Sequence, residues 1–382
     1  MGPLRCTLHV SLQTCAMRFL HGSDVFVRSA VQAWVEVTFK GTDTTRPCCT
    51  YDGYTYADQN CSARTINTQM PANRAGHSAV STGSESILCG GYTSKTSTSV
   101  TFSGNGNDID CWWFVPLPFA HFSPLKIKSG SAKPAARFAH ASAEDEHTGH
   151  MLVFGGMTKG NKALDDCWYL LLSESVSTTS EQQWVSCNPT SSLMKPMARY
   201  GAGAVFHDDS HSFYIYGGFA RSGLSVIPMS DMWVLRDFVN VSSSKWEEIN
   251  AVSDKPTPRG MHAMWLMGYN IFIHGGEGPG GVGIASVRSD TWSYDIFTQV
   301  WKQYGSSDAS PLASSQSVGL VGSQAVSFGG LGKDSTPINK CVFFDAKIGW
   351  TSVTPAGAVL CMCPSLCTTH THTHTHTHTQ CG

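Results

Sequence analysis

Four arginines recur at long, similar intervals along the chain: Arg74, Arg137, Arg199 and Arg259. In three of the four cases a histidine follows three residues later, as His77, His140 and His262. Guanidinium groups gathered on one face would recognise carboxylate or phosphate groups of a ligand, because the planar fork of arginine pairs with two oxygens at once. The alternative is that each arginine forms an internal ion pair, and recurrence favours it, because a ligand rarely shares the symmetry of a repeat.

An Asp-x-Trp motif follows each arginine and offers it an internal partner. The four motifs begin at Asp110, Asp166, Asp231 and Asp290. A fifth unit has Lys340 and Val342 at the corresponding positions. The three histidines are expected to be satisfied residues of inner strands, with a shared metal site as the alternative.

Gly-Gly pairs mark the elements that must position these side chains. Five short apolar runs each end in such a pair, whose first residues are Gly90, Gly155, Gly217, Gly275 and Gly329, at intervals of 65, 62, 58 and 54 residues. A second tryptophan ends four of the units, at Trp184, Trp246, Trp301 and Trp350. Each unit is predicted to form four short strands, and a period of this length predicts a repeat architecture.

This pattern resembles the kelch repeat: an apolar strand into Gly-Gly, a loop, a strand with an aromatic residue, and a tryptophan in the outer strand. The resemblance is strong over roughly residues 72–355. It implies an all-β fold, a kelch-type β-propeller of four-stranded blades around a channel. Glycine, which has no Cβ, would let the neighbouring blade approach closely, and the repeated tryptophans would fill the space between blades.

A single propeller is expected over residues 1–363, with a low-complexity Thr-His tail at 364–382. Five blades are predicted at about 72–130, 135–190, 197–250, 257–305 and 313–355. A sixth is predicted to combine about 14–40 with 356–363, so that the apolar run Gly357–Cys363 closes the ring as the inner strand of the N-terminal blade. The alternative is that residues 6–12 fill that place.

Composition and cysteine positions limit the function classes. The formal net charge of −2 gives no field that would attract nucleic acid or an anionic membrane, and no run approaches the ~20 apolar residues of a membrane span. Cys111, Cys167 and Cys341 occupy equivalent positions of different blades, too far apart for disulfides. We therefore expect unpaired, buried cysteines in an intracellular protein of the cytoplasm.

The longest loops are expected on one face of the ring. In propellers of this family the connections between strands two and three lie on the same side as those between blades. That face would carry the insertion 40–73, with Tyr51, Tyr54 and Tyr56, and the stretch 92–109; shorter loops lie around Arg221 and over 277–288. Aromatic residues on long loops over a rigid scaffold are typical of partner binding.

The sequence therefore predicts a protein-interaction module or scaffold, in one version the substrate-recognition subunit of a larger assembly. Its partner-binding residues are predicted to be Arg74, Arg137, Arg199, Arg259, Tyr51, Tyr54 and Tyr56. The alternative is a small-molecule or carbohydrate enzyme at the channel mouth. The family includes copper, mutarotase and iron-dependent members, but the Glu-x3-Asp-x3-His set of the last is absent, and we expect no cofactor. The alternating histidines at 370–378 are assigned to low-complexity sequence rather than a metal site.

Overall fold

The computed structural model describes residues 70–352, apart from 82–84, 96–98, 103, 116–120, 146–147, 173–179, 190–193, 224, 239–243, 251–252, 280–284, 306 and 308, together with four short strands at 6–13, 32–39, 50–51 and 54–55. Strands dominate this part of the chain, and its helical turns are three short 3-10 turns, η1 (Lys159–Asn161), η2 (Asp208–Ser210) and η3 (Lys333–Ser335).

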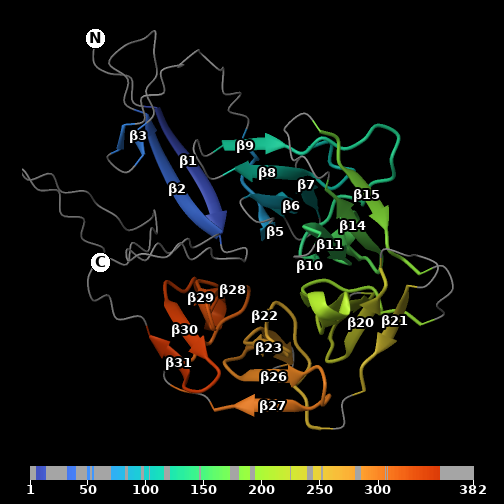
Figure 1. The fold of residues 1–382 in the computed structure, drawn as a ribbon, viewed down its shortest axis with the longest axis vertical. Coiled ribbons are helices and arrows are strands. Elements are labelled where there is room, and N and C mark those ends of the chain that lie inside the picture. The colour runs from blue at the N-terminus through green and yellow to red at the C-terminus, as the bar shows by residue number, and fades with distance from the viewer. Residues whose placement is uncertain are drawn as a thin grey trace, which may run out of the picture.

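Five antiparallel blades are arranged around a centre, as the kelch resemblance predicts (Figure 1). The first consists of β5 (Ala75–Ser81), β6 (Ser86–Lys95), β8 (Cys111–Val115) and β9 (His121–Pro124). The second consists of β10 (Ala141–Asp145), β11 (His150–Phe154), β14 (Cys167–Leu171) and β15 (Gln183–Ser186). The third consists of β16 (Gly203–His207), β17 (Ser212–Tyr216), β20 (Met232–Arg236) and β21 (Lys245–Glu248).

The last two blades follow the same plan. The fourth consists of β22 (Ala263–Met267), β23 (Asn270–His274), β26 (Thr291–Asp295) and β27 (Trp301–Tyr304). The fifth consists of β28 (Ser317–Val321), β29 (Gln324–Phe328), β30 (Cys341–Asp345) and β31 (Gly349–Ser352). In every blade the four strands pair in chain order, and each pair is antiparallel.

The second strand of each blade is the apolar run before the Gly-Gly pair. All five residues of β17 are buried, and four of five are buried in β11 and in β23. Such a strand has a neighbour on each edge and an adjacent blade over each face, which is why its residues do not alternate with polar ones. The first strand β10 does alternate, with Ala141, Ala143 and Asp145 buried.

The Gly-Gly pairs join each blade to the next one. The Gly156 N–H donates to the carbonyl of Arg199 at 2.8 Å, and the Gly218 N–H donates to the carbonyl of Arg259 at 2.8 Å. The first glycine of each pair has a positive φ, and a Cβ at Gly217 would lie 2.5 Å from the Arg259 oxygen. The predicted close approach of the neighbouring blade is therefore confirmed, and it explains why no larger residue fits.

The apolar cores lie between blades rather than within them. One core combines Phe154 and Tyr169 of the second blade with Phe213 and Trp246 of the third. Three further cores join the first blade to the second, the third to the fourth, and the fourth to the fifth. The outer-strand tryptophans, Trp184, Trp246, Trp301 and Trp350, are all buried, as predicted.

A two-stranded hairpin lies at the side of the ring between the first and fifth blades (Figure 1). It pairs β1 (Cys6–Gln13) with β2 (Gln32–Phe39) in antiparallel register. Part of the predicted sixth blade, around Trp34, is thus a strand, and residues 6–12 are paired directly with it. Residues 14–31 and 353–382 lie outside the described residues, so the six-bladed ring closed by 356–363 stays a prediction.

Two pairs of cysteines contradict the expectation of unpaired thiols. Cys89 and Cys111 form a disulfide between β6 and β8, with 4.2 Å between their Cα atoms. Cys167 and Cys187 form a second, with 5.1 Å between Cα atoms. The prediction compared equivalent positions of different blades, whereas these partners face each other within one blade.

Candidate functional site

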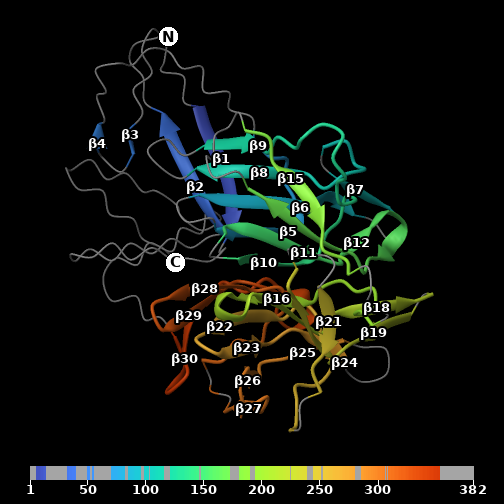
Figure 2. The ribbon, with the colours of Figure 1, turned by 45° about the vertical axis from the view of Figure 1, so that its right-hand side comes forward.

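One side of the ring, here called the long-loop face, carries the loops that lead into each blade and the connections between strands two and three. Four of these connections form small hairpins: β6 with β7 (Val100–Phe102), β12 (Met157–Thr158) with β13 (Lys162–Ala163), β18 (Phe219–Ser222) with β19 (Ser225–Pro228), and β24 (Glu277–Pro279) with β25 (Ala285–Val287). Several of them lie along one side of the molecule in Figure 2.

Backbone bridges fasten these hairpins to the lead-in loops. Phe138 bridges Met157, Tyr200 bridges Phe219, and Gly260 bridges Glu277. Each bridge joins the residue after the repeated arginine position to the residue after the Gly-Gly pair. The two kinds of loop therefore lie on the same face, as the sequence predicted.

The repeated arginines form one internal structure in each of the first four blades, here called the arginine clamp. In the third blade both terminal nitrogens of Arg199 donate to the two carboxylate oxygens of Asp231 at 2.7 Å. Arg199 also donates to the carbonyls of Gly217 and Met197, each at 3.0 Å. The indole N–H of Trp233 donates to the same Asp231 at 2.7 Å. One side chain thus fixes the lead-in loop, the Gly-Gly turn and the start of the third strand.

The same geometry recurs at Arg137 with Asp166 and at Arg259 with Asp290, where both terminal nitrogens again reach the carboxylate. In the first blade Arg74 donates to Asp110 at 2.8 Å and to the Gly90 carbonyl at 3.0 Å. Each partner is the aspartate of the arginine's own blade. The Asp-x-Trp motif is therefore the partner that the spacing predicted.

Burial and pairing favour the structural role for these arginines. Their side chains are at most 3% exposed, whereas the aspartate side chains are 19–28% exposed. Burial alone would raise the pKa of Asp166, but the hydrogen bond and charge of Arg137 and the bond from Trp168 outweigh it and lower that pKa. The same causes lower the pKa of Asp231 and Asp290. Direct contact of a partner with these guanidinium groups stays a prediction that substitution must test.

The fifth blade lacks the clamp as a unit. The Gly276 N–H donates to the carbonyl of Ala313, as the earlier pairs do to arginine carbonyls, so Ala313 occupies the arginine position. Lys340 occupies the aspartate position, and Val342 replaces the tryptophan. All three members are missing together, and an arginine left alone there would be a buried, uncompensated charge.

The repeated histidines lie between blades and only in part match the expectation of satisfied groups. His140 contacts the hydroxyl of Ser78, in the preceding blade, at 2.6 Å through Nε2. Neither ring nitrogen of the buried His262 has a hydrogen-bond partner among the described residues, because Gly203 stands where the first blade has Ser78. Within that part of the chain no three His, Cys, Asp or Glu side chains gather as a metal site would require.

An aromatic cluster on the long-loop face was missed by the sequence reasoning. Phe102, Phe138 and Met157 are buried together, and Tyr92 and Tyr200 pack against them. The Lys95 ammonium lies 4.9 Å from the centroid of the Phe138 ring. These residues come from three blades. Their only sequence signal is their position: some directly follow a repeated arginine or a Gly-Gly pair, and the others lie in the loop after such a pair.

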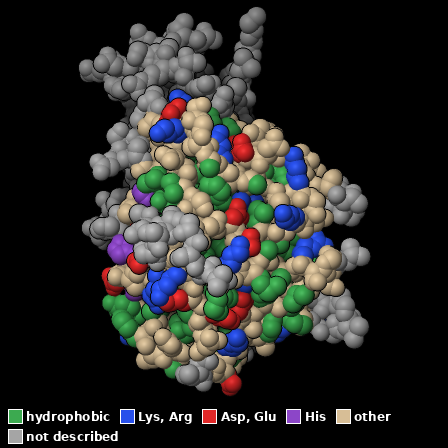
Figure 3. All heavy atoms as spheres, turned by 90° about the vertical axis from the view of Figure 1, so that its right-hand side faces the viewer, with side chains coloured by type: hydrophobic (Ala, Val, Ile, Leu, Met, Phe, Trp, Pro, Cys, Tyr) green, Lys and Arg blue, Asp and Glu red, His purple; other side chains and the backbone are tan. Residues whose placement is uncertain are grey.

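Two of the three tyrosines predicted to bind a partner lie within the described residues. Tyr51 lies in β3 (Thr50–Tyr51) and faces Tyr54 of β4 (Tyr54–Thr55) in antiparallel register, whereas Tyr56 lies outside the described residues. Their role as binding residues stays a prediction. On the side of the molecule shown in Figure 3, basic and acidic side chains are interspersed with apolar ones, which agrees with the small net charge.

Comparison with known proteins agrees with this architecture. The model of the KLHDC2/KLHL20/DRC7 Kelch-repeats domain matches residues 76–330 and 175–378. The chain belongs to the kelch-repeat family. Kelch-repeat relatives are typically protein-interaction or adaptor proteins. Among the described residues, none of the helical turns is long or apolar enough to cross a bilayer.

Three curated relatives are similar at low identity. An F-box/kelch-repeat protein of Arabidopsis thaliana is 26% identical over 281 residues, which are 69% of this chain and 53% of that protein. Dynein regulatory complex subunit 7 of Chlamydomonas reinhardtii is 29% identical over 39% of this chain and 11% of its own length. A leucine-zipper-like transcriptional regulator 1 homolog of Drosophila melanogaster is 26% identical over 60% and 21%. The chain thus spans about half or less of the curated relatives that it matches.

Proposed function

We propose that this kelch-repeat chain is a protein-interaction module, and that its partner binds across the long-loop face. The observation that carries the proposal is the row of hairpins on that face. Each of the first four blades carries a hairpin on that face. Next to each hairpin, an arginine clamp fixes the lead-in loop, the Gly-Gly turn and the start of the third strand. Variable loops on a rigid, repeated scaffold are the usual arrangement for recognition.

The relatives support the same class of function without naming a partner for this chain. One relative carries an F-box beside its kelch repeats and another is a subunit of a dynein regulatory complex, so related repeats occur in larger assemblies. We extend this to a role for the present chain as the recognition subunit of an assembly in the cytoplasm. The insertion 40–73 and its tyrosines are part of the proposed binding face.

Affinity capture with four baits tests the proposal. The first is the intact chain, the second lacks residues 42–70, and the third has residues 221–226 of the β18–β19 hairpin replaced by a short Gly-Ser turn. A fourth bait carries Tyr269→Ser in the turn between β22 and β23, and serves as the control outside the long-loop face. We expect a specific partner that is lost from the second or third bait and kept by the control.

Two results would count against the module. Either the intact chain captures no specific partner, or every bait captures the same partner, which would move the binding surface away from the long-loop face. Turnover of a small carbohydrate or metabolite that survives both deletions would instead support the enzyme alternative. Thermal melts of all four baits show whether a lost partner reflects a lost surface or a lost fold.

A further inference from the structure

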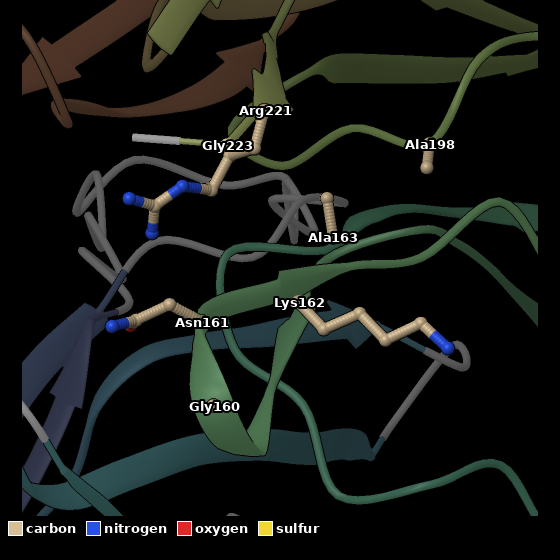
Figure 4. Close-up of a pocket in the computed structure, with 7 residues that line it drawn as sticks. All are labelled: Gly160, Asn161, Lys162, Ala163, Ala198, Arg221 and Gly223. Carbon is tan, nitrogen blue, oxygen red and sulfur yellow. The ribbon is translucent and has the colours of Figure 1, made fainter. Parts of the chain in front are cut away.

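A cleft of about 340 Å³ opens on the long-loop face between the hairpins of the second and third blades. Figure 4 shows the seven residues that line it: Gly160, Asn161, Lys162, Ala163, Ala198, Arg221 and Gly223. The first four belong to the β12–β13 hairpin, the last two to the β18–β19 hairpin, and Ala198 to the lead-in loop of the third blade. The cleft is thus built from three segments that the clamps hold in place.

The lining consists of small residues and two basic ones. Gly160 and Gly223 have positive φ angles, and a Cβ at either would meet nothing within 4 Å, so these glycines leave open space rather than relieve a contact. Ala163 and Ala198 add only methyl groups. An extended peptide backbone could therefore lie against this surface without displacing a side chain.

The two basic side chains lack carboxylate partners among the described residues. Arg221 is half-buried and Lys162 is exposed, and no ion pair or side-chain hydrogen bond joins either to that part of the chain. Their basic neighbours are paired, since Arg199 binds Asp231 and Lys195 binds Asp165 at 2.6 Å. Lys159, just outside the cleft, reaches only the amide oxygen of Asn107, at 3.4 Å, so the cleft and the adjoining η1 turn carry positive charge without a carboxylate partner among the described residues.

Figure 4 shows these two charges at opposite ends of the cleft. The guanidinium of Arg221 and the amide of Asn161 project toward one end, the Lys162 side chain extends toward the other, on the side of Ala198, and Ala163 lies between. A guanidinium beside an amide offers several N–H donors to the two oxygens of a carboxylate, and the ammonium of lysine offers a single point charge.

We propose that this cleft binds an extended acidic segment of the protein partner, with one Asp or Glu side chain at Arg221 and Asn161 and a second acidic side chain at Lys162. The inference rests on the proposed function, since it names the chemistry of the partner on the same face. No aromatic side chain lines the cleft, so it lacks the stacking platform on which single-stranded nucleic acids rely.

A random 12-residue peptide library displayed on phage and panned against the full chain tests this. Enriched peptides are synthesised with a fluorescent label and titrated by anisotropy at low and high salt. We expect peptides with two spaced acidic residues, an affinity that falls with salt, and a loss of about tenfold with Arg221→Ala, the size of one charge-assisted contact. Arg221→Glu should lose more, and Lys162→Ala should lose several-fold.

Matched variants separate the cleft from general electrostatics. Lys347→Ala removes an exposed lysine in the turn between β30 and β31 and should leave the affinity unchanged. Arg221→Lys keeps the charge without the fork and should recover only part of the affinity. Because Arg221 and Lys162 are not part of a core, all these variants should melt like the parent chain.

Other outcomes overturn the inference in distinguishable ways. Enriched peptides without acidic residues, or with affinities that Arg221→Ala leaves unchanged, reject the acidic segment while the interaction module stands. Binding of a phosphoserine peptide with no binding of its Asp and Glu counterparts rejects the carboxylate in favour of a phosphate site. Failure to enrich any peptide, together with failure of the intact bait to capture a partner, rejects both proposals.

Discussion

The arginine clamp makes one buried side chain responsible for several loops. Arg199 uses its guanidinium to hold Asp231, its own lead-in loop and the Gly217 carbonyl, while its backbone carbonyl accepts from the preceding blade. A buried ion pair of this kind is costly to desolvate, and its stabilising effect depends on every donor being used. The complete set of contacts explains why the clamp is present or absent as a whole.

Arg199→Ala should destabilise the chain strongly, because it leaves the Asp231 carboxylate and the Gly217 carbonyl without their donor. We expect the free energy of unfolding to fall by about 3 kcal/mol, the low end for a broken buried pair. The low end applies because the Asp231 side chain is 19% exposed and water can reach it. Urea denaturation followed by tryptophan fluorescence measures the change.

Lys195→Ala is the control for that experiment. Its ion pair with Asp165 is as short, at 2.6 Å, but both side chains are 42–50% exposed, so the expected loss is below about 1 kcal/mol. Equal effects of the two substitutions would show that the clamp contributes no more than a surface ion pair.

Four histidines, of which His77 is half-buried and the other three are buried, make stability depend on pH. Burial above all lowers the pKa of His77 and His274 to about 4, and that of His140 and His262 to about 3. In the unfolded chain these groups titrate near 6.5, so the unfolded state takes up protons first. Their stabilising contribution is complete above about pH 6.5 and is lost as the pH falls toward 4 to 3, at about 1.4 kcal/mol per unit and histidine.

Denaturation at pH 7.5, 6 and 5 checks this dependence. His262→Gln should reduce the slope of the free energy of unfolding against pH, between pH 6 and 5, by the contribution of one histidine. Glutamine is the replacement because Gln316 already occupies the equivalent position of the fifth blade. A slope that the substitution leaves unchanged would place the proton uptake elsewhere. The sequence indicated His77, His140 and His262 as internal residues, but not His274. It also did not show that His262 lacks hydrogen bonds among the described residues, since that follows from Gly203 in the neighbouring blade.

At the scale of elements, the Gly-Gly turns and the strands before them were predictable because their residue types leave few alternatives. An apolar run that ends in two glycines has to be a buried strand meeting another backbone. The small hairpins beyond the turns were not predictable in detail. The tips of these hairpins are small or polar and exposed, as at Ser222, Gly223 and Ser225, and many sequences satisfy such a turn.

Gly217→Ala tests the contact between blades. The substitution adds a Cβ 2.5 Å from the Arg259 oxygen at a φ of 61°, so both strain and a backbone clash oppose it. Gly268→Ala is the matched control, because φ is 58° and nothing lies within 4 Å. We expect the free energy of unfolding to fall by about 1 kcal/mol in the control and by clearly more in Gly217→Ala, as measured by thermal unfolding. Similar losses would mean that backbone conformation alone explains the glycine.

Because of the two disulfides, we expect the stability of the first and second blades to depend on the redox state of the solution. They close loops of 22 and 20 residues, for which chain entropy gives up to about 3 kcal/mol each. Peptide mapping without reductant should recover Cys89 linked to Cys111 and Cys167 linked to Cys187, and reductant should lower the melting temperature. Recovery of four free thiols from protein purified under oxidising conditions would contradict this. Sequence reasoning missed both pairs because their proximity depends on strand register.

At the scale of the whole molecule, five blades could be predicted because the repeat is strong, whereas the closure of the ring could not. The first seventy residues lack a Gly-Gly pair, so they carry no repeat signal that fixes the register of a sixth blade. The β1–β2 hairpin pairs residues 6–13 with residues 32–39, whereas the alternative prediction gave residues 6–12 the place of the inner strand. Partner-binding residues are equally hard to predict, because the most regular residues of the chain are the structural ones.

Truncation tests the predicted closure. A chain ending at residue 366 should melt like the full chain, because only the Thr-His tail is removed. A chain ending at 355 also loses the apolar run 357–363 and should melt at a lower temperature, or in two steps, if that run completes the N-terminal blade. Identical melts for all three chains would assign the closure to the N-terminal hairpin instead.

The hydrogen bonds that run from one Gly-Gly pair to a carbonyl of the next lead-in loop form in an order set by synthesis, because the donor always precedes the acceptor in the chain. During synthesis Gly156 leaves the ribosome before Arg199, and Gly218 leaves it before Arg259, so every finished blade displays an unpaired N–H until its successor emerges. The nascent chain is most vulnerable to wrong strand pairing in these intervals. Slow translation between two blades should therefore harm the yield of folded protein more than slow translation within one.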